Sequence, residues 1–264
     1  MLVTYSRIEP HELYHVSRSG FLGGAGRVLV FLNFPTAPMA IAVLALVTDR
    51  LRARWSARVA LVLCLVVLVP GVVDQEDLDA KWINALPALG VALVAVLTIW
   101  AVLRTGTGGA ARASGDGARI ALVAALTLVA LPWIFAEVGF YIGDVPLLGR
   151  VFRSKQVYEG AASVHLGEHH GLQGLLLVVT ALLLSRELGR MRRARLRTAL
   201  AVYLSVLIPY GIGNMANDGW KEQIVERGWT SWTFPDVLRP DLTWIWAITA
   251  AAGAAIYLLF FRRI

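Results

Sequence analysis

The sequence predicts an all-α integral membrane protein, a bundle of seven transmembrane helices with its N-terminus outside and its C-terminus inside. Hydrophobic residues make up 57% of the 264 residues and charged residues only 16%, a balance that ordinary soluble domains do not have. The apolar residues also gather into runs long enough to cross a bilayer, which takes roughly 20 residues in a helix. A soluble domain is therefore excluded.

Seven apolar runs define the predicted spans, and polar or charged segments separate them. Residues 1–26 lack the short hydrophobic stretch of a cleavable signal, so we interpret them as an extracytoplasmic N-terminal segment. Residues 27–264 are expected to form a single transmembrane domain. Its spans are predicted near 28–48, 57–73, 86–103, 119–140, 162–185, 197–215 and 242–261.

Several spans contain features that affect their course. The first contains Pro35 and Pro38, the second Pro70 and the sixth Pro209, and the missing N–H of each proline predicts a kink. In the fifth, the apolar stretch 171–185 is only fifteen residues long, which is too short to cross a bilayer. That span must therefore begin among the polar residues before it.

Basic residues are concentrated in alternate connecting segments. The segments 49–58, 104–119 and 186–197, together with Arg262 and Arg263, hold 15 of the 25 basic residues. The positive-inside rule places them in the cytoplasm, so all five histidines and 15 of the 18 acids lie outside. We expect a multi-pass protein of the plasma (cytoplasmic) membrane, of the bacterial inner-membrane type. Basic residues spread between spans in this way do not predict nucleic-acid binding.

A histidine cluster precedes the fifth apolar run. If the segment is helical, His165, Glu168 and His169 share one face, and His170 points about a quarter-turn away. The spacing matches the H-x-x-E-H pattern of zinc-dependent inverzincins, in which two imidazoles bind the metal and a carboxylate acts as base. It predicts a site for Zn²⁺ or another divalent metal. Alternatively, these side chains hydrogen-bond to neighbouring helices and water. Candidates for a further metal ligand are Asp218, Glu222 and Glu137.

Carboxylates at three places on the outer side are candidate catalytic acids. Glu76 and Asp77 belong to a loop with four carboxylates in six residues, where mutual repulsion favours a protonated form. Glu137 lies at the outer end of the fourth span, where a carboxylate needs a partner or a proton. Asp218 follows Asn214 in the segment 211–236, which we interpret as a long outer connection. Each place has an alternative interpretation. Glu76 and Asp77 would belong to a solvated loop, Glu137 would form a hydrogen bond near a kinked helix, and Asp218 would cap the end of the sixth span.

Aromatic residues accompany these acids and predict an apolar binding pocket. Such rings bind lipid-like molecules and stabilise positive charge. The alternative is an interfacial aromatic belt. The candidate substrate-binding residues are Trp82, Trp133, Phe140, Tyr141, Asn214 and Trp220.

In size, helix number and placement of acids, the chain resembles the small seven-helix membrane-bound terpene cyclases of meroterpenoid and indole-terpenoid pathways. In that family essential acids lie near the second–third and the sixth–seventh span connections. The resemblance implies that Glu76 or Asp77 and Asp218 occupy similar places here. We therefore expect an enzyme that cyclises a lipid-like, isoprenoid substrate by acid initiation near the outer face, with no cofactor required.

Two other functions fit parts of the pattern. A metal-dependent membrane hydrolase, with His165 and His169 as ligands and Glu168 as base, explains the histidines better and the aromatic residues less well. A proton-coupled transporter would use Glu137 and the histidines as a relay. Charged groups gathered on one side argue against transport. A purely structural or sensory protein is a further alternative.

The sequence contains no G-x-S-x-G or Walker motif, so nothing predicts nucleotide binding.

Overall fold

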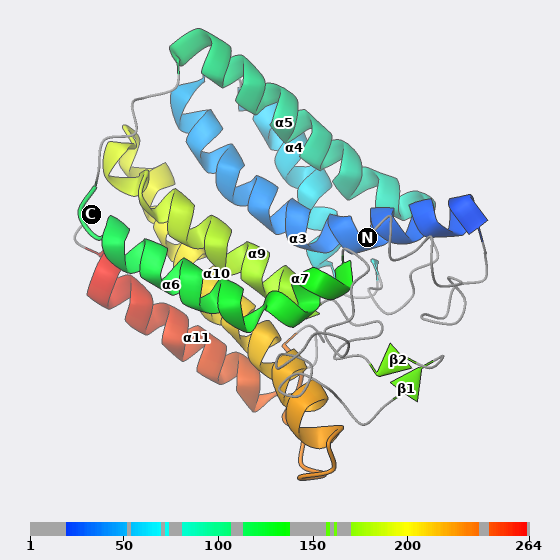
Figure 1. The fold of residues 1–264 in the computed structure, drawn as a ribbon. Coiled ribbons are helices and arrows are strands. Elements are labelled where there is room, and N and C mark those ends of the chain that lie inside the picture. Colours follow the sequence, from blue (N-terminus) through cyan, green and yellow to red (C-terminus); the bar gives the residue numbers. More distant parts are fainter. Residues whose placement is uncertain are drawn as a thin grey trace.

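The structure, a computed structural model, describes residues 20–51, 54–69, 72–73, 81–106, 113–137, 157–158, 161–162, 170–237 and 243–262. These residues form an almost entirely helical bundle (Figure 1). One antiparallel ladder pairs β1 (Val157–Tyr158) with β2 (Ala161–Ala162) beside it. The predicted helical class is confirmed.

Each of the seven predicted ranges contains helix. The helices are α3 (Gly20–Arg50), α4 (Arg54–Leu65), α5 (Ala85–Thr105), α6 (Asp116–Val129), α7 (Leu131–Glu137), α9 (His170–Ser185), α10 (Ala194–Trp220) and α11 (Trp244–Ile256). Short 3₁₀ turns add Val66–Leu68, Trp82–Asn84 and Leu188–Arg190, and π-helical turns add Lys221–Val225 and Tyr257–Phe261.

Four of these helical stretches are long and apolar enough to cross a membrane. They are Trp82–Thr105, His170–Arg190, Ala194–Val225 and Trp244–Phe261. Many large apolar side chains on their surfaces are exposed, including Leu103 and Leu259, as expected of helices that face lipid. The chain thus has the character of a membrane protein. Seven spans and their orientation stay predictions.

Prolines explain two departures from uninterrupted spans. The predicted span 119–140 is divided between α6 and α7, and Pro132 lies at the second position of α7. Its missing N–H cannot donate to the carbonyl of Leu128, so the helix changes direction there. Val69, which precedes Pro70, has the extended backbone that proline imposes on the residue before it. In contrast, α3 continues through Pro35 and Pro38, and α10 continues through Pro209.

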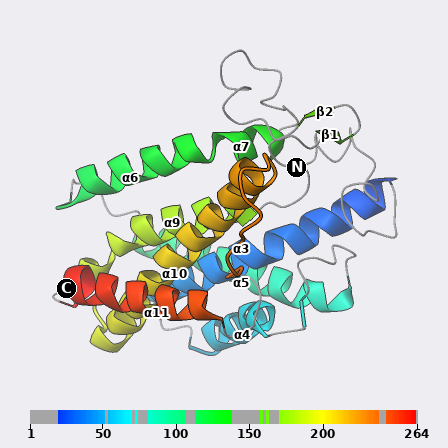
Figure 2. The same cartoon turned by 90° about the horizontal axis from the view of Figure 1, so that it is seen from below.

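The bundle is built around the closely packed pair α9 and α10. Figures 1 and 2 show α3, α4 and α5 together on one side of this pair and α11 on another, with α6 along the outside. Gly174 of α9 and Gly211 of α10 face each other so closely that a Cβ atom on Gly174 would lie 2.3 Å from the carbonyl oxygen of Gly211. Small residues at such a crossing let two backbones approach, as in membrane helix pairs generally.

Segments rich in arginine gather at one end of the bundle, which we call the arginine-rich end. It comprises the ends of α3, α5 and α9 and the beginnings of α4, α6 and α10, and Figure 1 shows them on the same side. Asp49 accepts hydrogen bonds from the backbone N–H groups of Arg192 and Arg193, both at 2.9 Å. Glu187 pairs with Arg190 at 2.8 Å and with Arg50 at 3.5 Å. These contacts join α3 to the connection between α9 and α10.

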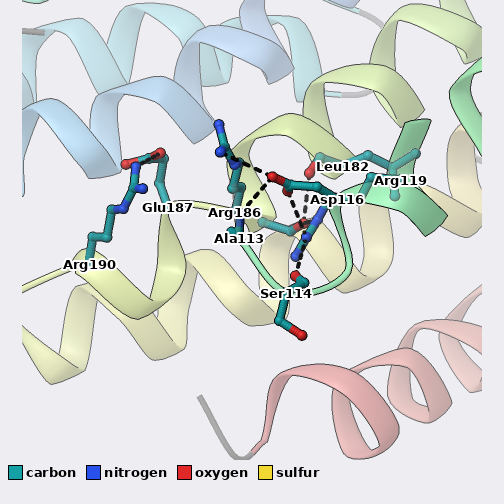
Figure 3. A network of polar contacts seen from close by, with 9 residues as sticks. Ala113, Ser114, Asp116, Arg119, Leu182, Arg186, Glu187 and Arg190 are labelled. Atoms are coloured by element: carbon teal, nitrogen blue, oxygen red, sulfur yellow. Dashed lines mark hydrogen bonds and ion pairs between the residues drawn. The ribbon is translucent and has the colours of Figure 1, made fainter. Parts of the chain in front are cut away.

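Asp116 is at the centre of a second group of contacts at this end (Figure 3). Its carboxylate lies 3.0 Å from Arg186 and 3.3 Å from Arg119, and it accepts the N–H of Ala113 at 2.8 Å. Arg119 also donates to the hydroxyl of Ser185 at 3.0 Å. The start of α6 is thereby tied to the end of α9.

We expect Asp116→Asn to remove part of the acid dependence of stability. The N–H of Ala113, followed by the charges of Arg186 and Arg119, holds the pKa of Asp116 below its ordinary value despite partial burial. A carboxyl group with a lowered folded-state pKa contributes stability above its unfolded pKa, and this contribution is lost as pH falls through the folded pKa. In detergent unfolding experiments, the free energy of unfolding of the wild type should exceed that of the variant at neutral pH. This difference should shrink below about pH 4. A difference that stays constant into strong acid would contradict this.

Candidate functional site

Three buried polar side chains form a stripe along the last turns of α10 and the π-helical turn after it. Asn214, Asp218 and Glu222 are four residues apart, which places them on one face of the helix. They are 0%, 1% and 5% exposed, respectively. We call these residues the polar stripe. Burying carboxylates in an apolar bundle is costly, so the stripe needs either polar partners or a function that justifies the cost.

Asp218 binds the beginning of α9. Its Oδ2 atom accepts the backbone N–H of Gly171 at 2.6 Å. The first N–H groups of a helix have no partner within the helix, and the helix dipole is positive there. The Asp218 carboxylate therefore caps α9 from the neighbouring helix and is stabilised as an anion.

Glu222 binds the indole of Trp133. The Nε1–H group of Trp133, which comes from α7, donates to Oε2 of Glu222 at 3.0 Å within the protein interior. Trp133 is 3% exposed, and its ring lies against Gly171, where a Cβ atom would come within 2.3 Å of it. Residues from α7, α9 and α10 thus meet around the two carboxylates.

Amide groups on α10 and α9 extend the polar region. Neither the oxygen nor the nitrogen of the Asn214 amide forms a hydrogen bond within the described part of the chain, and the same is true of Oε1 of Gln173 on α9. The hydroxyl of Tyr210 approaches the Asn214 amide, but without hydrogen-bonding geometry. The Tyr210 ring stacks on Trp246 with centroids 5.8 Å apart. Buried amides of this kind can bind a polar group of a ligand or an ordered water.

An aromatic cluster covers the end of α10. Trp220 donates from its indole to the carbonyl of Trp232 at 3.0 Å, and its ring meets Trp232 edge-on at 5.4 Å and Phe234 at 6.4 Å. Asn217 donates to the carbonyl of Phe234 at 3.1 Å. These bonds hold Trp232 and Phe234 against the helix.

The sequence interpretation of 211–236 as an outer connection is wrong for its first half. Helix α10 continues to Trp220, and the π-helical turn carries the helix on to Val225. Asn214 and Asp218 therefore lie within a helix and not in a loop after it. The helix persists because the polar side chains face the bundle, where partners such as the N–H of Gly171 are available.

The other candidate residues have different locations. Trp82 precedes α5 and is 80% exposed, as an interfacial tryptophan would be. Glu137 is the last residue of α7. His170 begins α9, and its Nδ1 lies 4.0 Å from Asp236. Seven candidates lie outside the described residues: Glu76, Asp77, Phe140, Tyr141, His165, Glu168 and His169.

The metal site predicted from the histidines is not formed by the residues that the structure describes. Among these, no three histidine, cysteine, aspartate or glutamate side chains converge as ligands. His165, Glu168 and His169 are not among them, so the H-x-x-E-H hypothesis stays a prediction.

Two members of the site were undervalued from the sequence. Glu222 was considered only as a further metal ligand, and Gln173 was not considered. Four-residue spacing from Asn214 through Asp218 to Glu222 was the available signal for the first, once α10 is extended beyond its apolar part.

No protein family matches the sequence, and no curated protein or solved structure matches it.

Proposed function

We propose that the protein is an integral membrane enzyme that cyclises a lipid-like, isoprenoid substrate by acid initiation at the polar stripe. The observation that supports this most strongly is the pair of buried carboxylates beside the Trp133 ring, Asp218 on α10 and Glu222 one turn later in the π-helical turn. An acid held in a mostly apolar interior can protonate an alkene without competition from water.

The hydrogen-bond donors suggest how the two acids divide the work. Asp218 receives a backbone N–H at the positive end of α9, which stabilises a negative charge. Glu222 receives a neutral indole N–H from Trp133. We therefore assign the proton to Glu222 at the start of the reaction and the negative charge to Asp218.

The proposed reaction conserves atoms and protons. Glu222 gives its proton to a carbon–carbon double bond of the substrate, which leaves a carbocation. Each ring closure uses the electron pair of the next double bond to form a carbon–carbon bond, and the positive charge moves along the chain. Asp218 takes a proton from the last cation, so the product is an isomer of the substrate. Asp218 then releases this proton to solvent and Glu222 takes up another proton from solvent, which restores the enzyme.

Aromatic rings would stabilise the intermediate cations. The faces of tryptophan rings attract positive charge, and desolvated contacts of this kind are worth about 2 kcal/mol. Trp133 lies at the Glu222 carboxylate and is buried. The Asn214 amide could orient a polar group at one end of the substrate. Under this proposal no cofactor is required.

The test is incubation of the purified protein with a panel of polyprenyl alkenes in deuterated water. A solvent-exchanged carboxyl group should place one deuterium in each cyclised product, which mass spectrometry detects. Glu222→Gln should abolish the labelled product, whereas Glu226→Gln, which changes a partly buried acid one turn further on, should not. Product without deuterium, or equal loss in both variants, would contradict the proposal.

Metal analysis of the same preparation distinguishes the hydrolase alternative. We expect no stoichiometric transition metal in the wild-type protein. About one Zn²⁺ per chain, lost in the double variant His165→Ala, His169→Ala, would instead indicate a metal-dependent hydrolase built on the H-x-x-E-H pattern.

A further inference from the structure

We propose that Arg192, Arg193, Arg195 and Arg197, at the arginine-rich end, bind the phosphate head groups of anionic phospholipids. We call these residues the Arg192–Arg197 surface. This inference does not depend on the proposed enzymatic function, because it concerns the opposite end of the bundle from the polar stripe.

Other arginines neutralise the acids at this end. Asp116 is paired with Arg186 and Arg119, and Glu187 is paired with Arg190 and Arg50. Within the described part of the chain, no carboxylate lies within ion-pair distance of the four guanidinium groups of the Arg192–Arg197 surface. Their positive charge is therefore available to an external anion.

Asp49 limits which groups of the protein are free to bind that anion. It already occupies the backbone N–H groups of Arg192 and Arg193, just before α10 begins, with both of its oxygen atoms. An external phosphate is therefore bound by side chains and not by the helix N-terminus. Guanidinium groups suit this task because their planar donors match phosphate oxygens in pairs.

The location of the surface favours a lipid over a free anion. The candidate span that contains α10 begins at Ala194, so these arginines are placed at the head-group level of a bilayer. Arg195 is exposed and lies on the same helix face as Val202 and Val206, which are 45% and 39% exposed. An acyl chain can follow this apolar face while its phosphate reaches Arg195.

The experiment compares thermal unfolding of the full-length protein in detergent with added phosphatidylglycerol or phosphatidylcholine. Phosphatidylglycerol should raise the Tm of the wild type, and phosphatidylcholine should not. The variant Arg192→Gln, Arg195→Gln should lose more than half of this rise. Asp49 keeps its two backbone donors in this variant, so its Tm without added lipid should be close to that of the wild type.

A matched control removes the same charge elsewhere at the same end. Arg104 and Arg262 are exposed, and neither pairs with a carboxylate within the described residues. The variant Arg104→Gln, Arg262→Gln should keep the full response to phosphatidylglycerol. Equal loss in both double variants would show an effect of net charge and overturn the proposal. So would a wild type that does not respond, or an equal rise with inorganic phosphate alone.

Discussion

Replacing Gly211 by alanine will destabilise the protein by about 1–3 kcal/mol, the cost typical of an overpacked interior. A Cβ atom at this position would lie 2.6 Å from the carbonyl oxygen of Gly174 and 2.7 Å from a methyl group of Val178. The first of these is backbone, which cannot rotate away. The helices α9 and α10 must therefore move apart. This weakens the hydrogen bond between Asp218 and the N–H of Gly171 and the packing around it.

Gly213→Ala is the matched control, because it makes the same change two residues further along α10. A Cβ atom there would meet only Val237, at 3.4–3.5 Å, which is ordinary contact. Alanine is about 1 kcal/mol more favourable than glycine within a helix, so this variant should be as stable as wild type or slightly more stable. Reversible unfolding in mixed micelles measures both. Equal destabilisation of the two variants would refute the close crossing of α9 and α10.

Hydropathy was sufficient to locate helix in all seven predicted ranges, because a helix that crosses a bilayer needs a long apolar run whether its side chains face the bundle or lipid. It failed where polar residues continue a helix, as in α10 beyond residue 215. A polar side chain ends an apolar run in the sequence, whereas in the structure it continues the helix if it faces partners in the bundle. Asp218 has such a partner in the N–H of Gly171, 47 residues earlier.

The candidate site was predictable in its residue types but not in its pairings. Asp218 was singled out because a carboxylate near a membrane face is costly without a partner, and Asn214 and Trp133 because they accompany such acids in the sequence. The bond between Trp133 and Glu222 joins residues 89 positions apart, and no local pattern indicates which aromatic residue meets which acid. The arginine-rich end was more predictable, because its basic residues are concentrated in alternate connecting segments of the sequence.

Asp218→Asn will reduce turnover by at least about 10²-fold, the usual lower bound for removing a catalytic proton-transfer group. Asparagine has nearly the same shape, and its side-chain oxygen can still accept the N–H of Gly171. The cap on α9 is therefore kept, and the free energy of unfolding should change by no more than about 1 kcal/mol, the net value of one hydrogen bond. What the variant lacks is a base and a negative charge.

This separation of stability from activity distinguishes the two roles open to Asp218. If the carboxylate serves only as a helix cap, Asp218→Asn should turn over substrate nearly as fast as wild type, and Asp218→Ala should be the damaging change because it removes the acceptor. If it receives the final proton, both variants should be inactive, although only Asp218→Ala loses stability. Unfolding and product formation measured on the same preparations decide between these roles, and an active Asp218→Asn would remove Asp218 from the proposed mechanism.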